Sequence, residues 1–188
     1  MDKREQILAA TAAVIAEYGL ESCPMAKIAK AANVGAGTIY RYFTTKEVLI
    51  EELHAFLAQE ISQHCLTDYN VKLGVRQRFD HMWGRFYEFM RQHTEKLRLL
   101  EQLQASPALC SATREETLRS IHSETVALFD EAKKIGEIKD LPNELLATVT
   151  FGSLFNIAKK QQQCPHLDLK PQVQDLLDLC WDAIAKRQ

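Results

Sequence analysis

Apolar residues recur at intervals of three and four positions along most of the chain, the spacing that gives a helix one buried face. Only seven Gly and five Pro interrupt the 188 residues, which favours long helices over many short strands. The pattern predicts an all-α fold with about nine helices and no strand, the fourth helix opened by a capping box of Thr44 and Glu47. The expected helices cover roughly residues 3–18, 24–32, 36–43, 44–65, 71–92, 94–104, 113–135, 142–163 and 171–186.

The second and third predicted helices flank a short turn, Asn33-Val34-Gly35, which is the layout of a helix-turn-helix. From Pro24 to Lys46 the sequence holds four basic residues and no acidic residue. A small unit with this charge and with Thr and Tyr hydroxyls suits the phosphate backbone of DNA. We therefore expect the N-terminal segment to bind duplex DNA.

The third predicted helix is too short to be stable alone, so burial has to fix it in place. We expect Ile39, Tyr40 and Phe43 to pack inward. The opposite face, with Thr38 and Arg41, would then be rigid enough to enter a major groove. Thr38 and Arg41 are candidates for contacts with base edges, because Arg can bond guanine in bidentate fashion. A phosphate contact is the alternative role for Arg41.

One motif runs through these helices and into the fourth. Its positions are Ile28-Ala29-x-x-Ala32 and Val34-x-x-Gly37-x-Ile39-Tyr40-x-Tyr42-Phe43-x-x-Lys46-x-x-Leu49. In this motif the chain closely resembles the TetR/AcrR family of bacterial transcriptional repressors, over about its first 50 residues. Asn33 stands where the family usually has Gly, at a turn position that needs positive φ, and Asn tolerates that conformation best after Gly. The resemblance implies a DNA-binding domain over residues 1–46 and a ligand-binding and dimerisation domain over residues 47–188.

The resemblance also implies which side chains meet DNA. Tyr42 matches an aromatic phosphate contact of the family, and Lys46 would meet phosphate beside the N-terminus of the fourth helix. Gly37 would either let the backbone approach DNA closely or serve packing between helices. The candidate DNA-binding residues are Lys27, Ala36, Gly37, Thr38, Arg41, Tyr42 and Lys46.

A single helix-turn-helix makes few contacts, so such modules pair across a two-fold axis and bind palindromic DNA. The resemblance implies that the last two helices pair with their copies as a four-helix bundle in a homodimer. Both helices are more apolar than one buried side requires, which supports a second partner. The candidate interface residues are Leu146, Thr150, Leu154, Val173, Leu177, Cys180 and Trp181.

The helices between residues 71 and 163 carry many Met and aromatic side chains. Such a stripe at helical spacing is often simply core. The resemblance favours a pocket for a small apolar or aromatic inducer, whose binding would reposition the fourth helix and separate the two recognition helices. The candidate lining residues are Met82, Trp83, Phe86, Met90, Phe129, Phe151 and Phe155.

Charge and composition narrow the class of protein. The net charge is −2; residues 1–46 hold six Lys/Arg and four Asp/Glu (+2), and residues 47–188 hold 17 and 21 (−4). No apolar run approaches the roughly 20 residues of a membrane span, and the N-terminus does not resemble a secretion signal, so we expect a cytoplasmic protein without a membrane partner. No catalytic motif, cofactor motif or metal-ligand spacing is present, so we expect no enzyme activity, no cofactor and no metal.

We therefore expect a ligand-responsive transcriptional regulator, a repressor that binds a palindromic operator as a homodimer and is released by its inducer. Two alternatives keep the same fold. One is a thiol-based redox sensor that uses Cys110 or Cys164, and the other is a constitutive DNA-binding platform for a partner. A helical enzyme unrelated to DNA is the third alternative.

Overall fold

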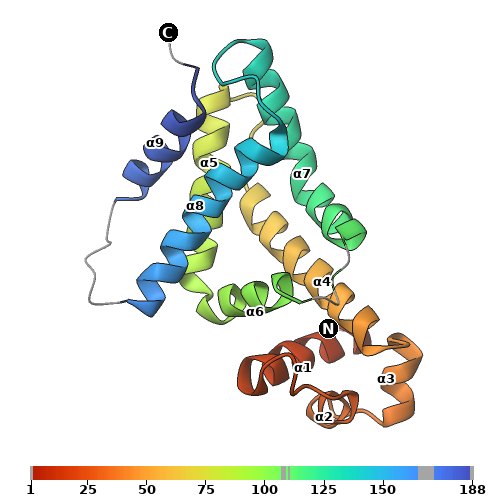
Figure 1. Ribbon diagram of the computed structural model, residues 1–188. Coiled ribbons are helices and arrows are strands. Elements are labelled where there is room, and N and C mark those ends of the chain that lie inside the picture. The colour runs from red at the N-terminus through yellow and green to blue at the C-terminus, as the bar shows by residue number, and fades with distance from the viewer. Residues whose placement is uncertain (1, 107–108, 110, 165–171, 187–188) are drawn as a thin grey trace. The chain divides into compact units, whose positions relative to one another are not determined.

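The computed structural model describes residues 2–106, 109, 111–164 and 172–186, with the backbone alone over residues 111–122 (Figure 1). Within these ranges the regular structure is helical, apart from one isolated antiparallel bridge between Ile138 and Ala185. The prediction of an all-α fold is confirmed. The helices are α1 (Lys3–Tyr18), α2 (Met25–Ala31), α3 (Ala36–Tyr42), α4 (Lys46–Leu66), α5 (Val75–Gln92), α6 (Thr94–Gln104), α7 (Ser111–Lys134), α8 (Asn143–Gln163) and α9 (Val173–Ile184).

The chain divides into two compact units. The first contains Met1–Glu60 and Glu95–Arg119, and the second contains Ile61–Thr94 and Ser120–Gln188. Helix α4 therefore belongs partly to each unit. This division follows compactness alone, and the domain boundary between residues 46 and 47 stays a prediction.

The first unit is built on α1, which buries Ile7, Leu8, Thr11, Val14 and Ile15. Asp2 and Glu5 form a capping box at its start, and Gly19 ends it with a φ of 78°. That positive φ is the reason for glycine at this position, since side chains disfavour the left-handed region. The amide of Gln6 donates to the Ala32 carbonyl at 2.9 Å, which joins α1 to the end of α2.

The start of α4 differs from the prediction. The hydroxyl of Thr45 accepts the Val48 amide at 3.2 Å, so Thr45 and not Thr44 caps the helix. The side chain of the preceding Phe43 is buried, and its backbone is extended, with φ −134° and ψ 103°. Thr44 therefore connects this extended residue to the helix and does not cap it. The predicted capping box of Thr44 and Glu47 is therefore wrong by one position.

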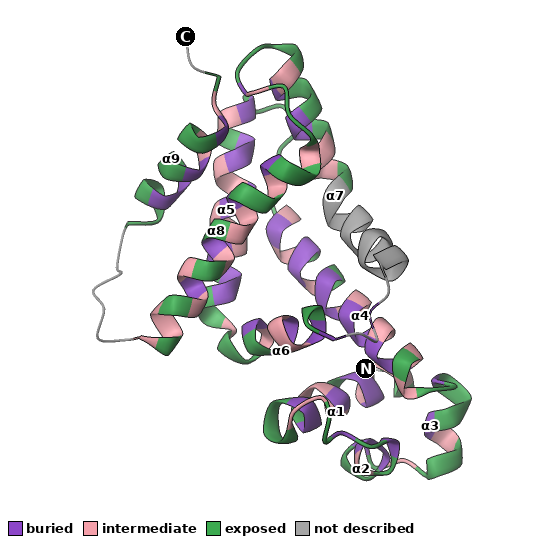
Figure 2. Cartoon of the chain, viewed as in Figure 1, coloured by how far each residue is buried: buried purple, intermediate pink, exposed green. Residues whose placement is uncertain are grey.

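The second unit has an aromatic core in which α5 packs against both α8 and α9. Trp83 of α5 is fully buried and stacks on Phe79 at 4.1 Å and on Phe151 of α8 at 4.3 Å between ring centroids. Trp181 of α9 meets Phe79 edge-on at 5.1 Å. The buried positions run along one side of α5 and α9 in Figure 2. Stacked and edge-on rings of this kind add to the free energy gained by burial alone.

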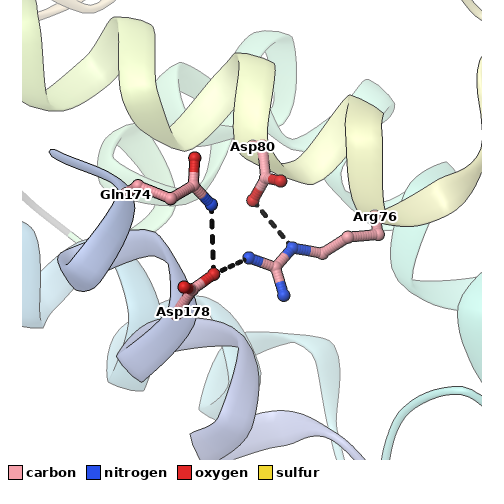
Figure 3. A network of polar contacts seen from close by, with 4 residues as sticks. All are labelled: Arg76, Asp80, Gln174 and Asp178. Atoms are coloured by element: carbon pink, nitrogen blue, oxygen red, sulfur yellow. Dashed lines mark hydrogen bonds and ion pairs between the residues drawn. The ribbon is translucent and has the colours of Figure 1, made fainter.

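A polar network on the surface also holds α9 to α5 (Figure 3). The Nε of Arg76 donates to Asp80 at 2.8 Å, and another nitrogen of the same guanidinium pairs with Asp178 of α9. The Gln174 amide donates to the same Asp178 oxygen at 3.0 Å. Arg76 also lies over the Trp181 ring, 5.3 Å from its centroid. The docking of α9 thus combines an apolar side with a charged edge.

Candidate nucleic-acid interface

The helix-turn-helix is formed by α2, α3 and the turn between them. Asn33 has a φ of 51°, which confirms the predicted left-handed turn position. The Val34 amide donates to the Ala29 carbonyl at 3.0 Å and closes the turn. Gly35 then precedes α3 in extended backbone and caps it without a side-chain hydrogen bond.

Burial on one side fixes α3. Ile39 is 0% exposed and Phe43 is 1% exposed, as predicted. Tyr40 is 51% exposed, so its predicted inward position is wrong. Ile39 and Phe43 lie four residues apart on one line of the helix, whereas Tyr40 is turned about 100° away from Ile39. Tyr40 is therefore an additional member of the outer surface and not part of the core.

The outer surface of α3 carries most of the predicted DNA-binding residues. Ala36, Gly37 and Arg41 are exposed, and Thr38 is half-buried. A Cβ atom built at Gly37 would meet no heavy atom within 4 Å. Packing among the described residues therefore does not require glycine at position 37, and close approach of the backbone to DNA stays a prediction.

Arg41 and Tyr42 form a pair at the end of α3. The guanidinium carbon of Arg41 lies 5.4 Å from the centroid of the Tyr42 ring, which is 39% exposed. A cation over an aromatic face is attracted by the ring quadrupole, so each side chain restrains the other. The pair presents a positive charge and a ring next to the turn that leads to α4.

The two lysines outside α3 are also held in place. The Nζ of Lys27 lies 3.5 Å from the centroid of the Tyr18 ring, and the Nζ of Lys46 donates to the Leu20 carbonyl at 2.9 Å. Burial raises the pKa of the Cys23 thiol, and the nearby charges of Lys46 and Lys27 oppose that rise. Both ammonium groups thus lie close enough to Cys23 to act on it. Because a carbonyl takes one of the three N–H groups of Lys46, two remain for an anion.

The residues expected to line a ligand pocket lie together in the second unit. Trp83 contacts Phe151 as described above and Phe129 at 5.5 Å between ring centroids, and Phe86 meets Phe151 edge-on at 5.0 Å. Met82 and Met90 are buried, and Phe155 is half-buried. These side chains pack as a core, and a ligand site among them stays a prediction. The Nε1 of Trp83 is buried and has no hydrogen-bond partner among the described residues.

The prediction for the dimer interface needs a correction. Helix α8 directs one face against α5 and α9, and the Cys180 thiol of α9 donates to the Thr150 carbonyl of α8 at 3.7 Å. Of the predicted residues, Val173 is exposed and Trp181 is half-buried. The other five fill the core of the protomer and cannot form an exposed surface: Leu146, Thr150, Leu154, Leu177 and Cys180. The exposed apolar side chains of α8 and α9 are Leu145, Val149, Val173 and Leu179.

Two of the described cysteines, Cys65 and Cys180, are poor candidates for a redox switch. Burial raises the pKa of the Cys65 thiol to about 12 and that of Cys180 to about 11, which disfavours the reactive thiolate at neutral pH. Of the two cysteines proposed for a switch, Cys164 is half-buried and Cys110 lies outside the described residues.

In the described ranges no group of three or more His, Cys, Asp or Glu could hold a metal ion. None of the described helices has the length and apolar character to cross a membrane.

Comparison with known proteins gives matches along most of the chain. Residues 7–53 match the bacterial regulatory proteins of the tetR family, and residues 75–185 match the tetracyclin repressor-like C-terminal domain. An uncharacterized HTH-type transcriptional regulator of Haemophilus influenzae is 28% identical over 187 residues, which are 98% of this chain and 97% of that protein.

Solved structures agree with these matches. A TetR-family transcriptional regulator from Vibrio parahaemolyticus is 30% identical with a TM-score of 0.83, over 99% of this chain and 100% of that one. FadR from Bacillus subtilis, solved in complex with stearoyl-CoA, shares the fold with a TM-score of 0.75 at 22% identity, over 95% of each chain. The relatives are regulators and not enzymes, in agreement with the expected lack of catalysis. With the helix-turn-helix geometry of α2 and α3, these matches show that the chain belongs to the tetR family of DNA-binding transcriptional regulators.

Proposed function

We propose that this protein is a homodimeric repressor that binds a palindromic operator through α3 and leaves it when a small apolar or aromatic ligand binds. The observation that carries the proposal is the outer surface of α3. It exposes Gly37, Tyr40 and Arg41 above the buried Ile39 and Phe43, in a segment without any acidic residue. A rigid, acid-free helix surface of this size suits the major groove of DNA.

The side chains around α3 divide into two roles. We assign base-edge contacts to Arg41, with Thr38 and Tyr40 on the same short helix. We assign phosphate contacts to Tyr42, the last residue of α3, and to Lys46 and Lys27 outside it, since they carry a hydroxyl or an ammonium group. Phosphate contacts fix the position of the protein on the duplex, and base contacts select the sequence.

The dimer is supported by the exposed apolar side chains of α8 and α9. Leu179 is 66% exposed and Leu145 is 47% exposed, and Val149 and Val173 are exposed as well. Soluble monomers seldom leave several large apolar residues exposed on neighbouring helices. The corresponding faces of a second copy would cover them, because a two-fold interface uses the same patch on both subunits.

The ligand is proposed to bind at the aromatic cluster around Trp83. Its indole N–H is buried without an acceptor among the described residues, which is unfavourable unless a further acceptor is supplied. An apolar ligand with one carbonyl or hydroxyl oxygen could accept a hydrogen bond from this N–H. Its apolar part would pack against the surrounding aromatic rings. FadR bound to stearoyl-CoA is a precedent on this fold for a ligand with a long apolar chain.

The test is DNA binding to fragments from the region upstream of the protein's own gene, measured by fluorescence anisotropy at fixed salt. We expect Tyr42→Phe and Lys46→Ala to weaken binding to every sequence, and Arg41→Ala to relax base preference at one position by about 1–3 kcal/mol. Tyr40→Phe tests the residue that the structure adds to the surface. Lys72→Ala, on an exposed loop of the second unit, is the matched control and should change nothing. Full affinity in all four surface variants would overturn the proposal.

A further inference from the structure

A second candidate site lies in the second unit, at a cleft of about 630 Å³ between the end of α7, the loop to α8 and the residue that follows the Ile138–Ala185 bridge. Small-molecule sites commonly have volumes of roughly 300–1,000 Å³. The charged lining consists of one carboxylate, Asp140, and four lysines: Lys133, Lys134, Lys139 and Lys186.

The charge of this lining is opposite to that of the surrounding body. Residues 47–188 hold 17 Lys/Arg and 21 Asp/Glu, a balance of −4, whereas the cleft holds four Lys and one Asp, a balance of +3. Lys133 and Lys134 lie in the last turn of α7, where cations stabilise the helix dipole. That explanation does not extend to Lys139 and Lys186, which come from two other segments of the chain.

Backbone pairing holds the two outer segments together. The Lys139 amide donates to the Ile184 carbonyl at 2.8 Å, and the Lys186 amide donates to the Glu137 carbonyl at 2.9 Å. These bonds flank the bridge between Ile138 and Ala185. The fold itself therefore holds the backbone of both lysine segments at the cleft, so only the side chains have to become ordered when a ligand binds.

The ammonium groups retain the capacity to bind an anion. Lys139 donates to the Ala183 carbonyl at 2.5 Å, and Lys133 donates to the Leu141 carbonyl at 3.3 Å and pairs with Asp130 at 3.4 Å. Each ammonium group has three N–H donors, so at least one donor of each lysine remains available to bind an anion. Lys134 and Lys186 are exposed, and neither ammonium group has a hydrogen-bond or ion-pair partner among the described residues.

The geometry points to a binding site for a small polyanion, a molecule with at least two phosphate or carboxylate groups that face Lys134, Lys186 and Lys139. Lysines are point charges that suit either group. Ile138 and Leu141 complete the lining and leave an apolar wall for the remainder of the ligand. The site shares no residue with the α3 surface or with the Trp83 cluster, so it does not depend on the proposed function.

The test is isothermal titration of the full-length protein with inorganic pyrophosphate and, separately, with citrate, at constant ionic strength. The double variant Lys134→Gln/Lys186→Gln should bind at least about tenfold more weakly, because two nearby positive charges are lost. The matched control is Lys72→Gln/Lys160→Gln, which changes the net charge equally at exposed positions outside the cleft and should stay within about twofold of the wild type. Lys186→Gln alone, beyond the end of α9, gives a second and milder variant, and circular dichroism verifies that each variant is folded.

Binding of pyrophosphate alone would identify a phosphate ligand, and binding of citrate alone would identify a polycarboxylate; either supports the site. The absence of binding for both probes overturns it. An equal loss in the control pair also overturns it, because binding would then depend on net charge and not on the cleft.

Discussion

Helices α3 and α9 are both docked through a buried apolar side, yet their free sides have opposite character. Helix α3 exposes a glycine, an arginine and two tyrosines, and the segment around it has no carboxylate. Helix α9 exposes Leu179 and Val173 and carries three aspartates and no basic residue. A cationic, hydrogen-bonding side suits nucleic acid, whereas an apolar side bordered by acids suits protein and repels DNA. The partner of each helix is thus indicated by its exposed side and not by its core.

The largest effect is expected when a charge is placed on the apolar side of α9, which tests whether this side binds protein. Leu179→Glu should weaken the homodimer by about 2 kcal/mol, roughly thirtyfold, because a carboxylate would be buried at the interface. The protomer should keep its fold, since Leu179 is 66% exposed within it. Sedimentation equilibrium over a range of concentrations measures the effect.

The matched control for this variant is Leu73→Glu. It makes the same substitution at an exposed leucine of the loop before α5, outside the sequence of α8 and α9. That variant should stay as dimeric as the wild type. A dimer of unchanged affinity in Leu179→Glu would show that α9 does not form the interface.

Periodicity predicted the helices but could not choose between their faces. Around α3, Phe43 is four residues from Ile39 and three from Tyr40, and both spacings fit one helix face. Only the structure shows that Tyr40 turns outward. Helix α8 is apolar on two sides, so its pattern cannot tell which side α5 and α9 cover. That is why Leu146, Thr150 and Leu154 were assigned to the interface although they are buried in the protomer.

The candidate sites also differ in how far the sequence alone can predict them. The candidate DNA-binding residues lie within one short stretch, so a local motif is enough to predict them. The lysine cleft depends on backbone pairing between residues about 50 positions apart, between Glu137 and Lys186, and only the folded chain brings these segments together. No local pattern indicates such a site.

A smaller and sharper test uses Gly37, where stability and DNA binding should change in opposite directions. Gly37→Ala should raise the free energy of unfolding by about 0.5–1 kcal/mol, because glycine inside a helix is destabilising and the added Cβ meets open space. The same methyl group should weaken DNA binding if the α3 backbone approaches the groove at this position. Thermal melts and anisotropy titrations measure the two quantities. A variant that is more stable and binds DNA normally would exclude close approach at Gly37.

The smallest expected effect concerns the charged edge that docks α9. Hydrogen bonds from Gln174 and Arg76 lower the pKa of Asp178 below its usual 3.8. A carboxyl whose pKa is lower in the folded state stabilises the fold above its unfolded pKa, and this contribution is lost as the pH falls through the folded pKa. The docking of α9 should therefore weaken as the pH drops below 3.8, whereas the segment from Pro24 to Lys46 has no carboxylate to titrate.

Asp178→Asn isolates this contribution, because the amide keeps the shape of the side chain and removes its charge. Thermal melts between about pH 3 and pH 6 should show a steeper acid loss for the wild type than for the variant. The difference should be small and reduced by salt, since the Asp178 side chain is 53% exposed and solvent screens its pair with Arg76. Asp182→Asn, an exposed position of the same helix, is the control. Parallel acid curves for the wild type and Asp178→Asn would mean that the aromatic contacts of Trp181 and Phe79 dock α9 without help from the charged edge.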